Sequence, residues 1–289
     1  MLLKQRPSRI YVTSNPPILT ASLVAFYCKL SKASFIYHVQ DIHPEATRIA
    51  VGMSNWLFEI LRRIDTSVLN SANTVITLTQ SMRQTLVGRG CMSKIVLVDN
   101  PSIDLNLRTD CRIHGVAFVG NAGRLQRMDE IIDEIDLYLS SGGTLTFKFA
   151  GGGVYSSDLE ALARKHVNFH YCGKVSAAEA FHISSSFSWA LLPITPDALH
   201  YAYPSKLASY LASGARIICY TDASSDLGIF IRDNSLGVIV GIDRGSLCGK
   251  FFELEHATIE SEFKPPKFYP LPEEFGTRLG SLVRGDRGR

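Results

Sequence analysis

The chain has 289 residues, of which 46% are hydrophobic, and its 30 basic and 27 acidic side chains give a formal net charge of +3. This length and hydrophobic content suffice for two domains with cores of their own and exclude a disordered chain. The near balance of charge excludes a dedicated nucleic-acid binder, which would carry a strongly basic patch. Any acidic ligand must therefore be held by a few local charges.

Cysteine spacing and hydropathy indicate the compartment. The six cysteines lie far apart, with neither a Cys-x-x-Cys pair nor a histidine spacing typical of zinc sites, so we expect small apolar residues in a reducing compartment. Arg6, Pro7 and Arg9 interrupt the start of the chain, and no uncharged apolar run approaches the roughly 20 residues of a membrane span. We expect a cytoplasmic protein that does not span a membrane.

Short apolar runs of the β type alternate with helical patterns along the whole chain. Such alternation predicts parallel sheets covered by helices on both faces, and hence a doubly wound α/β fold. The predicted strands are 10–13, 35–39, 74–78, 95–98, 116–119, 145–150, 167–171, 189–192, 217–220 and 238–240.

A domain boundary is predicted between the fourth and fifth strands. Asp99-Asn100-Pro101 gives a proline turn, and the polar stretch after it lacks periodicity. We place the boundary after residue 107, between an N-terminal lobe of 1–107 and a C-terminal lobe of 108–289 whose last helix would pack back on the first lobe. In such lobes, ligands bind at the carboxyl ends of the strands.

The first candidate anion site is Ala202-Tyr203-Pro204-Ser205-Lys206-Leu207, which leads into a helical run that stops at Gly214. A proline in the first helical turn, a hydroxyl and an ammonium lie here beside free backbone N–H groups, an arrangement that suits phosphate. The alternative is that Pro204 and Ser205 only start a helix and that Lys206 is a solvated surface charge.

The second candidate is Gly120-Asn121-Ala122-Gly123-Arg124-Leu125-Gln126, which follows a predicted strand and precedes a helical apolar pattern. A glycine turn at a helix N-terminus exposes backbone donors, and the guanidinium of Arg124 suits phosphate oxygens. The alternative is a tight strand-to-helix turn with Arg124 exposed.

The third turn, Gly151-Gly152-Gly153, tests for a dinucleotide-binding fold. The fingerprint Gly-x-Gly-x-x-Gly fails because its sixth position is Ser156, and the next strand ends in Tyr171-Cys172-Gly173-Lys174 without the acidic residue that would meet a ribose hydroxyl. A nicotinamide-dependent oxidoreductase is therefore disfavoured. The glycines instead predict close approach of a ligand or of the opposing lobe.

The N-terminal lobe offers one candidate catalytic residue. Asp41 follows the predicted strand 35–39, and its carboxylate could accept a proton or orient a hydroxyl. For the neighbouring His43-Pro44-Glu45 the alternative is a proline turn with a capping glutamate, and for His38 it is a buried imidazole with satisfied hydrogen bonds. No serine, cysteine or lysine lies in a recognisable nucleophile motif.

The chain contains no Asp-x-Asp, the carboxylate pair with which a sugar transferase usually holds a divalent ion on a nucleotide diphosphate. Positive side chains and helix N-termini would have to replace the metal, and Arg124 and Lys206 are the charges available. We therefore expect neither a metal nor another cofactor.

The predicted helix 54–69 has an apolar stripe with Arg62 and Arg63 beside it. We expect this stripe to pack on the sheet, and the alternative is an interfacial helix that touches anionic lipid headgroups. The stripe consists of Trp56, Leu57, Ile60, Leu61, Ile64 and Val68.

In their order and spacing, these motifs resemble the retaining GT-B sugar transferases of glycosyltransferase family four, especially the bacterial ones that build capsule, O-antigen or exopolysaccharide repeats. The resemblance covers nearly the whole chain. It implies two Rossmann-like lobes and transfer of a sugar from a nucleotide donor to a hydroxyl, with retained configuration and no obligatory metal. It rests on Val12-Thr13-Ser14-Asn15-Pro16-Pro17, Val39-Gln40-Asp41-Ile42-His43-Pro44-Glu45, Val98-Asp99-Asn100-Pro101, the two glycine turns, and Pro204-Ser205-Lys206-Leu207 with Gly214.

The resemblance also implies roles for single residues. Arg124, Ser205 and Lys206 would contact the donor diphosphate. The segment Cys172-Gly173-Lys174-Val175 would frame the nucleobase, and Asp41 would lie near the reacting sugar. The usual acceptors are saccharides linked to polyprenyl diphosphate, which adds peripheral association with the inner face of the cell membrane to the expectations. Further donor contacts would come from Asn121, Gly123, Gln126, Gly152, Gly153, Tyr203 and Ser209.

Three features depart from the family pattern. Ser209 stands where relatives have a glutamate that meets the ribose, and Arg127 stands where they usually have glycine, so that it would crowd the turn or add a phosphate contact. Relatives also carry further strand and helix units before the segment that matches Val12. The N-terminal lobe is thus expected to be incomplete. Three alternatives remain: the gene is shortened, a partner polypeptide completes the lobe, or the chain is a nucleotide-binding subunit without activity of its own.

Overall fold

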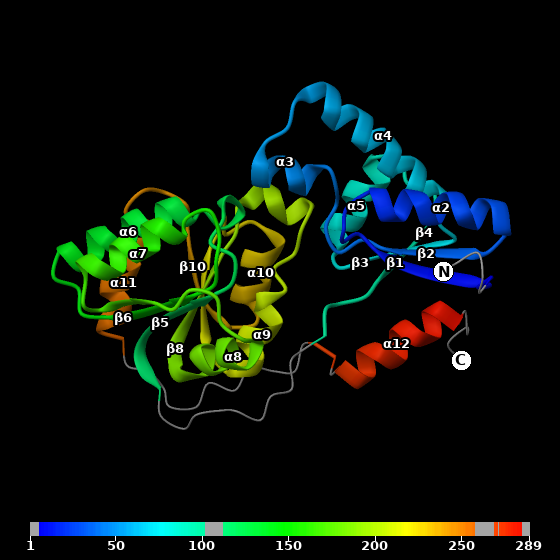
Figure 1. The fold of residues 1–289 in the computed structure, drawn as a ribbon. Coiled ribbons are helices and arrows are strands. Elements are labelled where there is room, and N and C mark those ends of the chain that lie inside the picture. Colours follow the sequence, from blue (N-terminus) through cyan, green and yellow to red (C-terminus); the bar gives the residue numbers. More distant parts are fainter. Residues whose placement is uncertain (1–5, 102–111, 258–268, 271, 285–289) are drawn as a thin grey trace. The chain divides into compact units, whose positions relative to one another are not determined.

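The computed structural model describes residues 6–101, 112–257, 269–270 and 272–284 (Figure 1). The chain forms two compact units. Unit 1 comprises Met1–Pro101, Asp197–Tyr203 and Tyr269–Arg289, and unit 2 comprises Ser102–Pro196 and Pro204–Phe268. The expected boundary after residue 107 lies outside the described residues.

The α/β class is confirmed, and all ten predicted strands are present with small shifts at their ends. In the described part of unit 1, four parallel strands form a sheet in the order β1-β2-β3-β4. They are β1 (Arg9–Thr13), β2 (Ser34–His38), β3 (Thr74–Thr77) and β4 (Lys94–Leu97), connected by the helices α2 (Leu19–Ser31), α3 (Glu45–Val51), α4 (Asn55–Ser71) and α5 (Gln80–Gly88).

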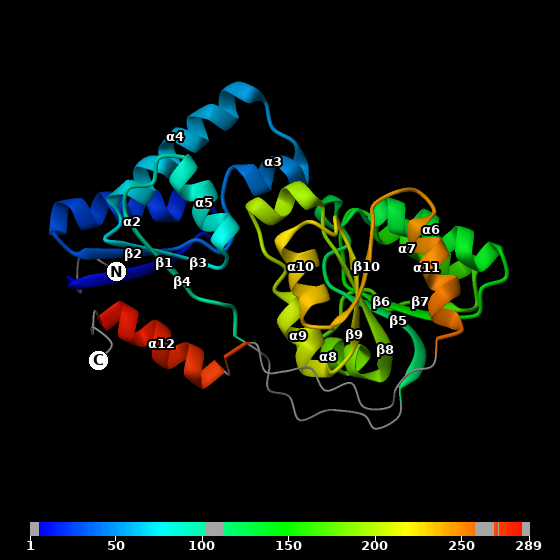
Figure 2. The same ribbon diagram turned by 180° about the vertical axis from the view of Figure 1, so that it is seen from behind.

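This sequential strand order fixes where the helices of unit 1 lie. Because parallel crossovers are right-handed, connections that always step in the same direction place their helices on one face of the sheet. The opposite face is covered by α12 (Pro272–Arg284), as Figures 1 and 2 show. Phe275, Leu279, Leu282 and Val283 of α12 pack against a cluster around Ile36, Ile76 and Val98.

A buried ion network ties the connecting helices of unit 1 together. Arg89 lies 2.8 Å from Asp65 and 3.1 Å from Glu45, and all three side chains are at most 8% exposed. Burial raises the pKa of Asp65 to about 6, against the opposing pull of the Arg89 guanidinium. Removing one partner would leave an uncompensated buried charge, which is strongly destabilising.

Unit 2 contains a six-stranded parallel sheet in the order β10-β9-β8-β5-β6-β7. Helices α6, α7 and α11 cover one face of this sheet, and α8, α9 and α10 cover the other (Figures 1 and 2). The strands are β5 (Ile113–Val119), β6 (Thr146–Ala150), β7 (Phe169–Tyr171), β8 (Phe187–Pro193), β9 (Arg216–Tyr220) and β10 (Gly237–Val240). The helices are α6 (Met128–Ser140), α7 (Ser156–Lys165), α8 (Ala177–Ser186), α9 (Lys206–Ser213), α10 (Asp226–Asp233) and α11 (Ser246–Glu255).

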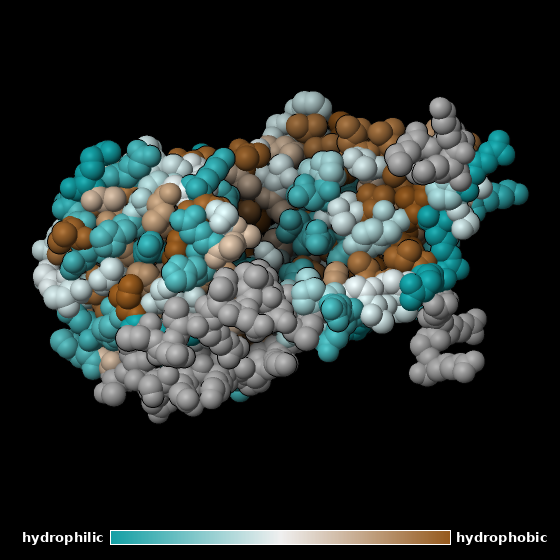
Figure 3. Space-filling view, turned by 60° about the horizontal axis from the view of Figure 1, so that its bottom comes forward, coloured by the Kyte–Doolittle hydropathy of each residue, from teal (hydrophilic) through white to brown (hydrophobic). Residues whose placement is uncertain are grey.

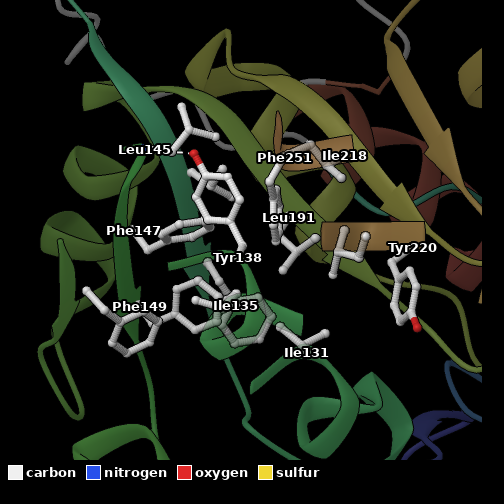
Figure 4. Packing of buried hydrophobic residues seen from close by; sticks show 14 of the residues in the cluster. Ile131, Ile135, Tyr138, Leu145, Phe147, Phe149, Leu191, Ile218, Tyr220 and Phe251 are labelled. Atoms are coloured by element: carbon white, nitrogen blue, oxygen red, sulfur yellow. Dashed lines mark hydrogen bonds between the residues drawn. The ribbon is translucent and has the colours of Figure 1, made fainter. Parts of the chain in front are cut away.

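The core of unit 2 is dense in aromatic rings (Figure 4). Tyr138 of α6 meets Phe147 and Phe251 edge to face, with ring centroids 5.8 and 5.5 Å apart. Its hydroxyl accepts a hydrogen bond from the backbone N–H of Leu145, at 3.0 Å. Such ring pairs add to the stabilisation from buried area, so the core gives the sheet a rigid base for the loops at its carboxyl edge.

The expectation for helix 54–69, here α4, is wrong for half of its apolar stripe. Val68 is buried, and Leu57 and Leu61 are half-buried. The outer side of the helix turns away from the sheet and leaves Trp56 67%, Ile60 46% and Ile64 40% exposed. In the part of Figure 3 that shows unit 1, hydrophobic residues form continuous areas. Within the described residues, no helix is long and apolar enough to cross a bilayer.

Candidate functional site

The carboxyl edge of the unit 2 sheet has a topological switch point between β5 and β8. From β5 the chain steps through β6 and β7 toward one edge, and from β8 it steps through β9 and β10 toward the other. The connections on the two sides leave toward opposite faces, which opens a crevice at the strand ends where α/β proteins bind ligands. Gly120 follows β5 at this point.

Lys206 lies at the same point. A Cβ built on Gly120, whose φ is +138°, would overlap the Cε and Nζ atoms of Lys206. The ammonium also lies over the ring of Phe118, 4.5 Å from its centroid. Burial lowers the pKa of Lys206 to about 8, and no carboxylate in the described part of the chain raises it again. A half-buried cation without an acidic partner is suited to bind an anion.

Tyr210 fixes the helix that carries Lys206. Its hydroxyl accepts a hydrogen bond from the backbone N–H of Val119 at 2.9 Å and lies 3.3 Å from the carbonyl oxygen of the same residue, to which it donates. Residues four apart share one face of a helix, so the contact that ties Tyr210 to β5 also places Lys206 over Gly120. Sequence reasoning missed Tyr210, although its spacing from Lys206 is a signal that could have found it.

Backbone hydrogen bonds connect the glycine-containing segments that follow β5, β6 and β7. The N–H of Gly120 donates to Ala150 at 2.8 Å, that of Ala122 to Gly152 at 2.9 Å, and that of Gly151 to Gly173 at 2.6 Å. A Cβ on Gly151 would overlap the carbonyl of Gly120. These glycines are therefore needed for close backbone approach between the turns. The structure brings the predicted glycine turns after β5 and β6 together with the segment Cys172-Gly173-Lys174-Val175 that follows β7.

Ser156, which breaks the dinucleotide fingerprint, closes the turn Gly151-Gly152-Gly153. Its hydroxyl accepts from the N–H of Gly153 at 3.0 Å and donates to the carbonyl of the same residue at 2.9 Å. Tyr171 at the end of β7 donates to the carbonyl oxygen of Gly151, at 2.6 Å. The turn is thus closed by side chains of the neighbouring elements.

Of the predicted donor residues after β5, Arg124 and Gln126 lie in a short 3-10 turn, Arg124–Gln126, and Gly123 is its N-cap. Asn121 and Arg124 are exposed, and Gly123 is buried. The Oε1 atom of Gln126 is buried without a hydrogen-bond partner. An unpartnered buried acceptor next to an exposed guanidinium is an arrangement that a ligand could complete.

Arg127 adopts a left-handed backbone with φ 50°, a conformation that favours glycine. Its guanidinium pairs with Glu130 at 2.5 Å, so the turn accommodates the side chain by pointing it to a carboxylate at the start of α6. The glycine of the family pattern therefore stands at a position with a conformational need for it.

The remaining predicted residues of unit 2 lie at the same edge. Cys172 and Lys174 are exposed around Gly173, which has φ +63°. A Cβ on Gly152 would come within 2.9 Å of the Cε atom of Lys174, so the side chain of this lysine reaches the turn Gly151-Gly152-Gly153.

Ser205, Ser209 and Gly214 lie at the start, in the middle and at the end of α9. Ser205 is exposed at the N-cap of α9 and makes no side-chain cap, so its hydroxyl is not used by the helix. Ser209 is half-buried on α9. Gly214 ends α9 with φ +75°, as predicted.

Tyr203 and Asp41 belong to unit 1. Tyr203 packs on the core of that unit and shares a side-chain hydrogen bond with Tyr269. Asp41 is half-buried, its backbone pairs with Ala202, and its N–H donates to Ser14 Oγ at 3.1 Å. Burial raises the pKa of the Asp41 carboxyl, which favours a role in proton transfer.

The start of α3 and the side chain of Arg89 hold the segment that follows Asp41. Pro44 takes the N-cap position of α3 and Glu45 its first turn. Arg89 donates to the carbonyl of His43 at 2.9 Å, so the ion network fixes this segment. His38 is 1% exposed and its Nδ1 lies 2.6 Å from the hydroxyl of Tyr11, but its Nε2 has no partner. The imidazole is thus buried, and only one of its two ring nitrogens has a hydrogen-bond partner.

Among the described residues, no three His, Cys, Asp or Glu side chains gather closely enough to hold a metal ion. The cations that could face an anionic ligand in unit 2 are Lys206, Arg124 and Lys174. Guanidinium and ammonium groups of this kind are suited to contact phosphate oxygens.

Comparisons with known proteins identify the fold. No family model matches the sequence, and no curated protein matches it significantly. TarM aligns with 99% of this chain and 54% of its own length, at 12% identity and a TM-score of 0.64. Anabaena HepE in complex with UDP and glucose aligns over 97% and 79%, at 12% identity and a TM-score of 0.69. The lipopolysaccharide outer core galactosyltransferase WaaB aligns over 99% and 77%, at 12% identity and a TM-score of 0.60.

These structures are GT-B glycosyltransferases, and the likeness shows that this chain has the GT-B fold of Rossmann-like lobes. The chain spans about half the length of TarM, 54%. Because folds host many activities, the function must be argued from the site.

Proposed function

We propose that the chain is a glycosyltransferase that takes a sugar from a nucleotide diphosphate donor, with the diphosphate held in unit 2. The observation that carries this proposal is Lys206, a half-buried ammonium at the switch point beside Gly120 that has no acidic partner among the described residues. The exposed guanidinium of Arg124 is a further cation after β5, and the joined glycine turns hold the backbone around Gly120 in place. HepE, which shares the fold, has been crystallised with UDP and glucose.

The finer expectations are part of the same proposal. Transfer would retain the anomeric configuration, as the resemblance implies. It would need no metal, because side-chain cations would offset the charge of the leaving diphosphate. Asp41, with its raised pKa, would act at the reacting sugar. The acceptor would be a saccharide or a polyprenyl-diphosphate-linked saccharide of a surface polysaccharide, reached at the inner face of the cell membrane. WaaB, which shares the fold, is a lipopolysaccharide outer core galactosyltransferase, and this supports a saccharide acceptor.

Calorimetric titration with UDP tests the diphosphate site. A charge-assisted hydrogen bond contributes roughly 1.5 to 3 kcal/mol, so Lys206→Ala should weaken UDP binding by about 10- to 150-fold. The matched control is Lys250→Ala, which removes a lysine of α11 that pairs with Glu253 and should leave the affinity unchanged. Equal affinity of wild type and Lys206→Ala would contradict the assignment.

A second candidate is a nucleotide-binding partner subunit that lacks activity of its own. Two observations favour it. Ser209 replaces the glutamate expected at the ribose, and β1 lies at a sheet edge where its residues are all at least partly exposed. Donor consumption by the purified chain, measured with and without other proteins of the pathway, separates the candidates, since turnover by the chain alone excludes the second.

A further inference from the structure

Helix α2 is apolar on two opposite sides. Ala21, Val24, Ala25 and Cys28 are buried against the sheet. The side that points away from the sheet carries another apolar row at helical spacing, in which each side chain is 63–70% exposed: Leu19, Leu23, Phe26 and Leu30. A surface helix normally turns polar residues outward, and a helix that is apolar all round is normally covered.

Helix α4 extends this surface. It packs against α2 and lies beside it in both ribbon views (Figures 1 and 2). Trp56, Ile60 and Ile64 recur at every fourth position of α4 and are 40–67% exposed. We call these three side chains and the outer row of α2 the α2–α4 face. Large apolar side chains exposed side by side on adjoining helices mark a site of association.

The charges around the face indicate what it associates with. Among residues 6–101, the exposed acidic side chains are Glu59 and Asp99, whereas the other acidic residues are buried or half-buried. Lys29 and Lys32 stand at the end of α2, and Arg63 stands on α4 next to Ile64. The exposed basic residues of the same range are Arg6, Arg9, Lys29, Lys32, Arg48, Arg63, Arg83 and Lys94.

We propose that the α2–α4 face binds the surface of a bilayer that contains anionic lipids. Leu and Phe side chains of α2 would enter the boundary between headgroups and acyl chains, with α2 parallel to the surface. Trp56 would lie at headgroup level, where amphipathic rings are favoured. Lys29, Lys32 and Arg63 would meet lipid phosphates, at about 1 kcal/mol for each charge near the surface. The proposal rests on the membrane association proposed above and names the surface responsible.

A lipid surface fits this face better than a protein partner does. It offers apolar contact and negative charge together over the whole area, which is the combination that the side chains of α2 and α4 present. The nearby exposed acidic residue is Glu59, four positions before Arg63, so repulsion from anionic headgroups would be small.

The test uses tryptophan fluorescence. The chain has two tryptophans, and Trp189 is buried at 5% exposure whereas Trp56 is exposed. A Trp189→Phe variant of the full chain leaves Trp56 as the reporter. With vesicles of equal parts phosphatidylglycerol and phosphatidylcholine we expect a blue shift of its emission, quenching by brominated acyl chains, and co-sedimentation. Vesicles of phosphatidylcholine alone should give much weaker binding, and high salt should weaken the binding to anionic vesicles.

The double variant Leu23→Ser/Phe26→Ser should reduce partitioning to anionic vesicles by at least about tenfold, because it removes two large apolar side chains from the contact. The matched control is Val154→Ser/Val167→Ser, which changes two valines of unit 2 that are 70% and 88% exposed. The control should partition like the wild type. UDP affinity of each variant, measured in the absence of vesicles, reports that the chain is folded and tests the nucleotide site separately.

Three outcomes would overturn the proposal: no binding to anionic vesicles by a chain that still binds UDP, equal binding to neutral and anionic vesicles, or unchanged partitioning of Leu23→Ser/Phe26→Ser. A concentration-dependent dimer that this variant abolishes, found without vesicle binding, would assign the face to a second copy of the chain. A wild-type chain that binds anionic vesicles but does not bind UDP would count against the proposed function. The proposal for the α2–α4 face would stand.

Discussion

The hydroxyl of Tyr210 bridges the backbone N–H and carbonyl of Val119, at 2.9 and 3.3 Å, and thereby joins α9 to the last residue of β5. The strand then turns at Gly120, over which Lys206 lies one helical turn before Tyr210. If Lys206 binds a diphosphate as proposed, its position for that contact would depend on the bridge between Tyr210 and Val119.

Tyr210→Phe removes this bridge while it keeps the ring in the core. Two half-buried backbone groups of Val119 lose a hydrogen bond to the hydroxyl, so we expect a loss of unfolding free energy of about 1–3 kcal/mol and a UDP affinity several-fold lower. Urea denaturation and calorimetry measure the two effects. Tyr220→Phe is the control, since its hydroxyl bonds to the partly exposed Glu130 and should change UDP affinity little. A Tyr210→Phe variant that binds UDP like the wild type would show that Lys206 is placed without the bridge.

Gly120→Ala should disrupt the candidate site directly. The added Cβ would overlap Lys206 and occupy a backbone with φ +138°, so we expect UDP affinity to fall about tenfold or more as the lysine is displaced. Gly142→Ala is the matched control, because it has φ +92° and open space around its Cβ. It should destabilise the fold by about 1 kcal/mol without changing UDP binding. Equal effects of both substitutions on affinity would refute the contact.

UDP binding should weaken at alkaline pH. Because burial lowers the pKa of Lys206 to about 8, the free protein loses this positive charge above that pH, and binding must then take up a proton. We expect the affinity to fall by up to about tenfold for each pH unit above 8. Lys206→Met should bind weakly with little dependence on pH over the same range. A wild-type affinity that stays constant from pH 7 to about 9.5 would contradict a role for this ammonium.

His38 should make the fold sensitive to mild acid. Burial lowers its pKa to about 4, from the ordinary 6.5, so the unfolded chain binds the proton more readily. Stability is therefore fully present above pH 6.5 and is lost as the pH falls toward 4, by on the order of 3 kcal/mol. Urea titrations at several pH values should show this loss, and His38→Asn should lose less. The control His170→Asn changes an exposed histidine of β7 and should follow the wild type. An identical pH dependence in His38→Asn would contradict the prediction.

The ten strands, the end of α9 at Gly214 and the glycine turns could be predicted from the amino-acid sequence, because each depends on local periodicity or on the conformational needs of single residues. Only the folded chain shows which turns meet, that Lys206 lies over Gly120 and that Tyr203 packs with unit 1. It also shows that one apolar row of α2 and half of the apolar stripe of α4 are exposed. These facts depend on contacts between residues far apart in the chain, and helical spacing defines an apolar stripe without stating what covers it.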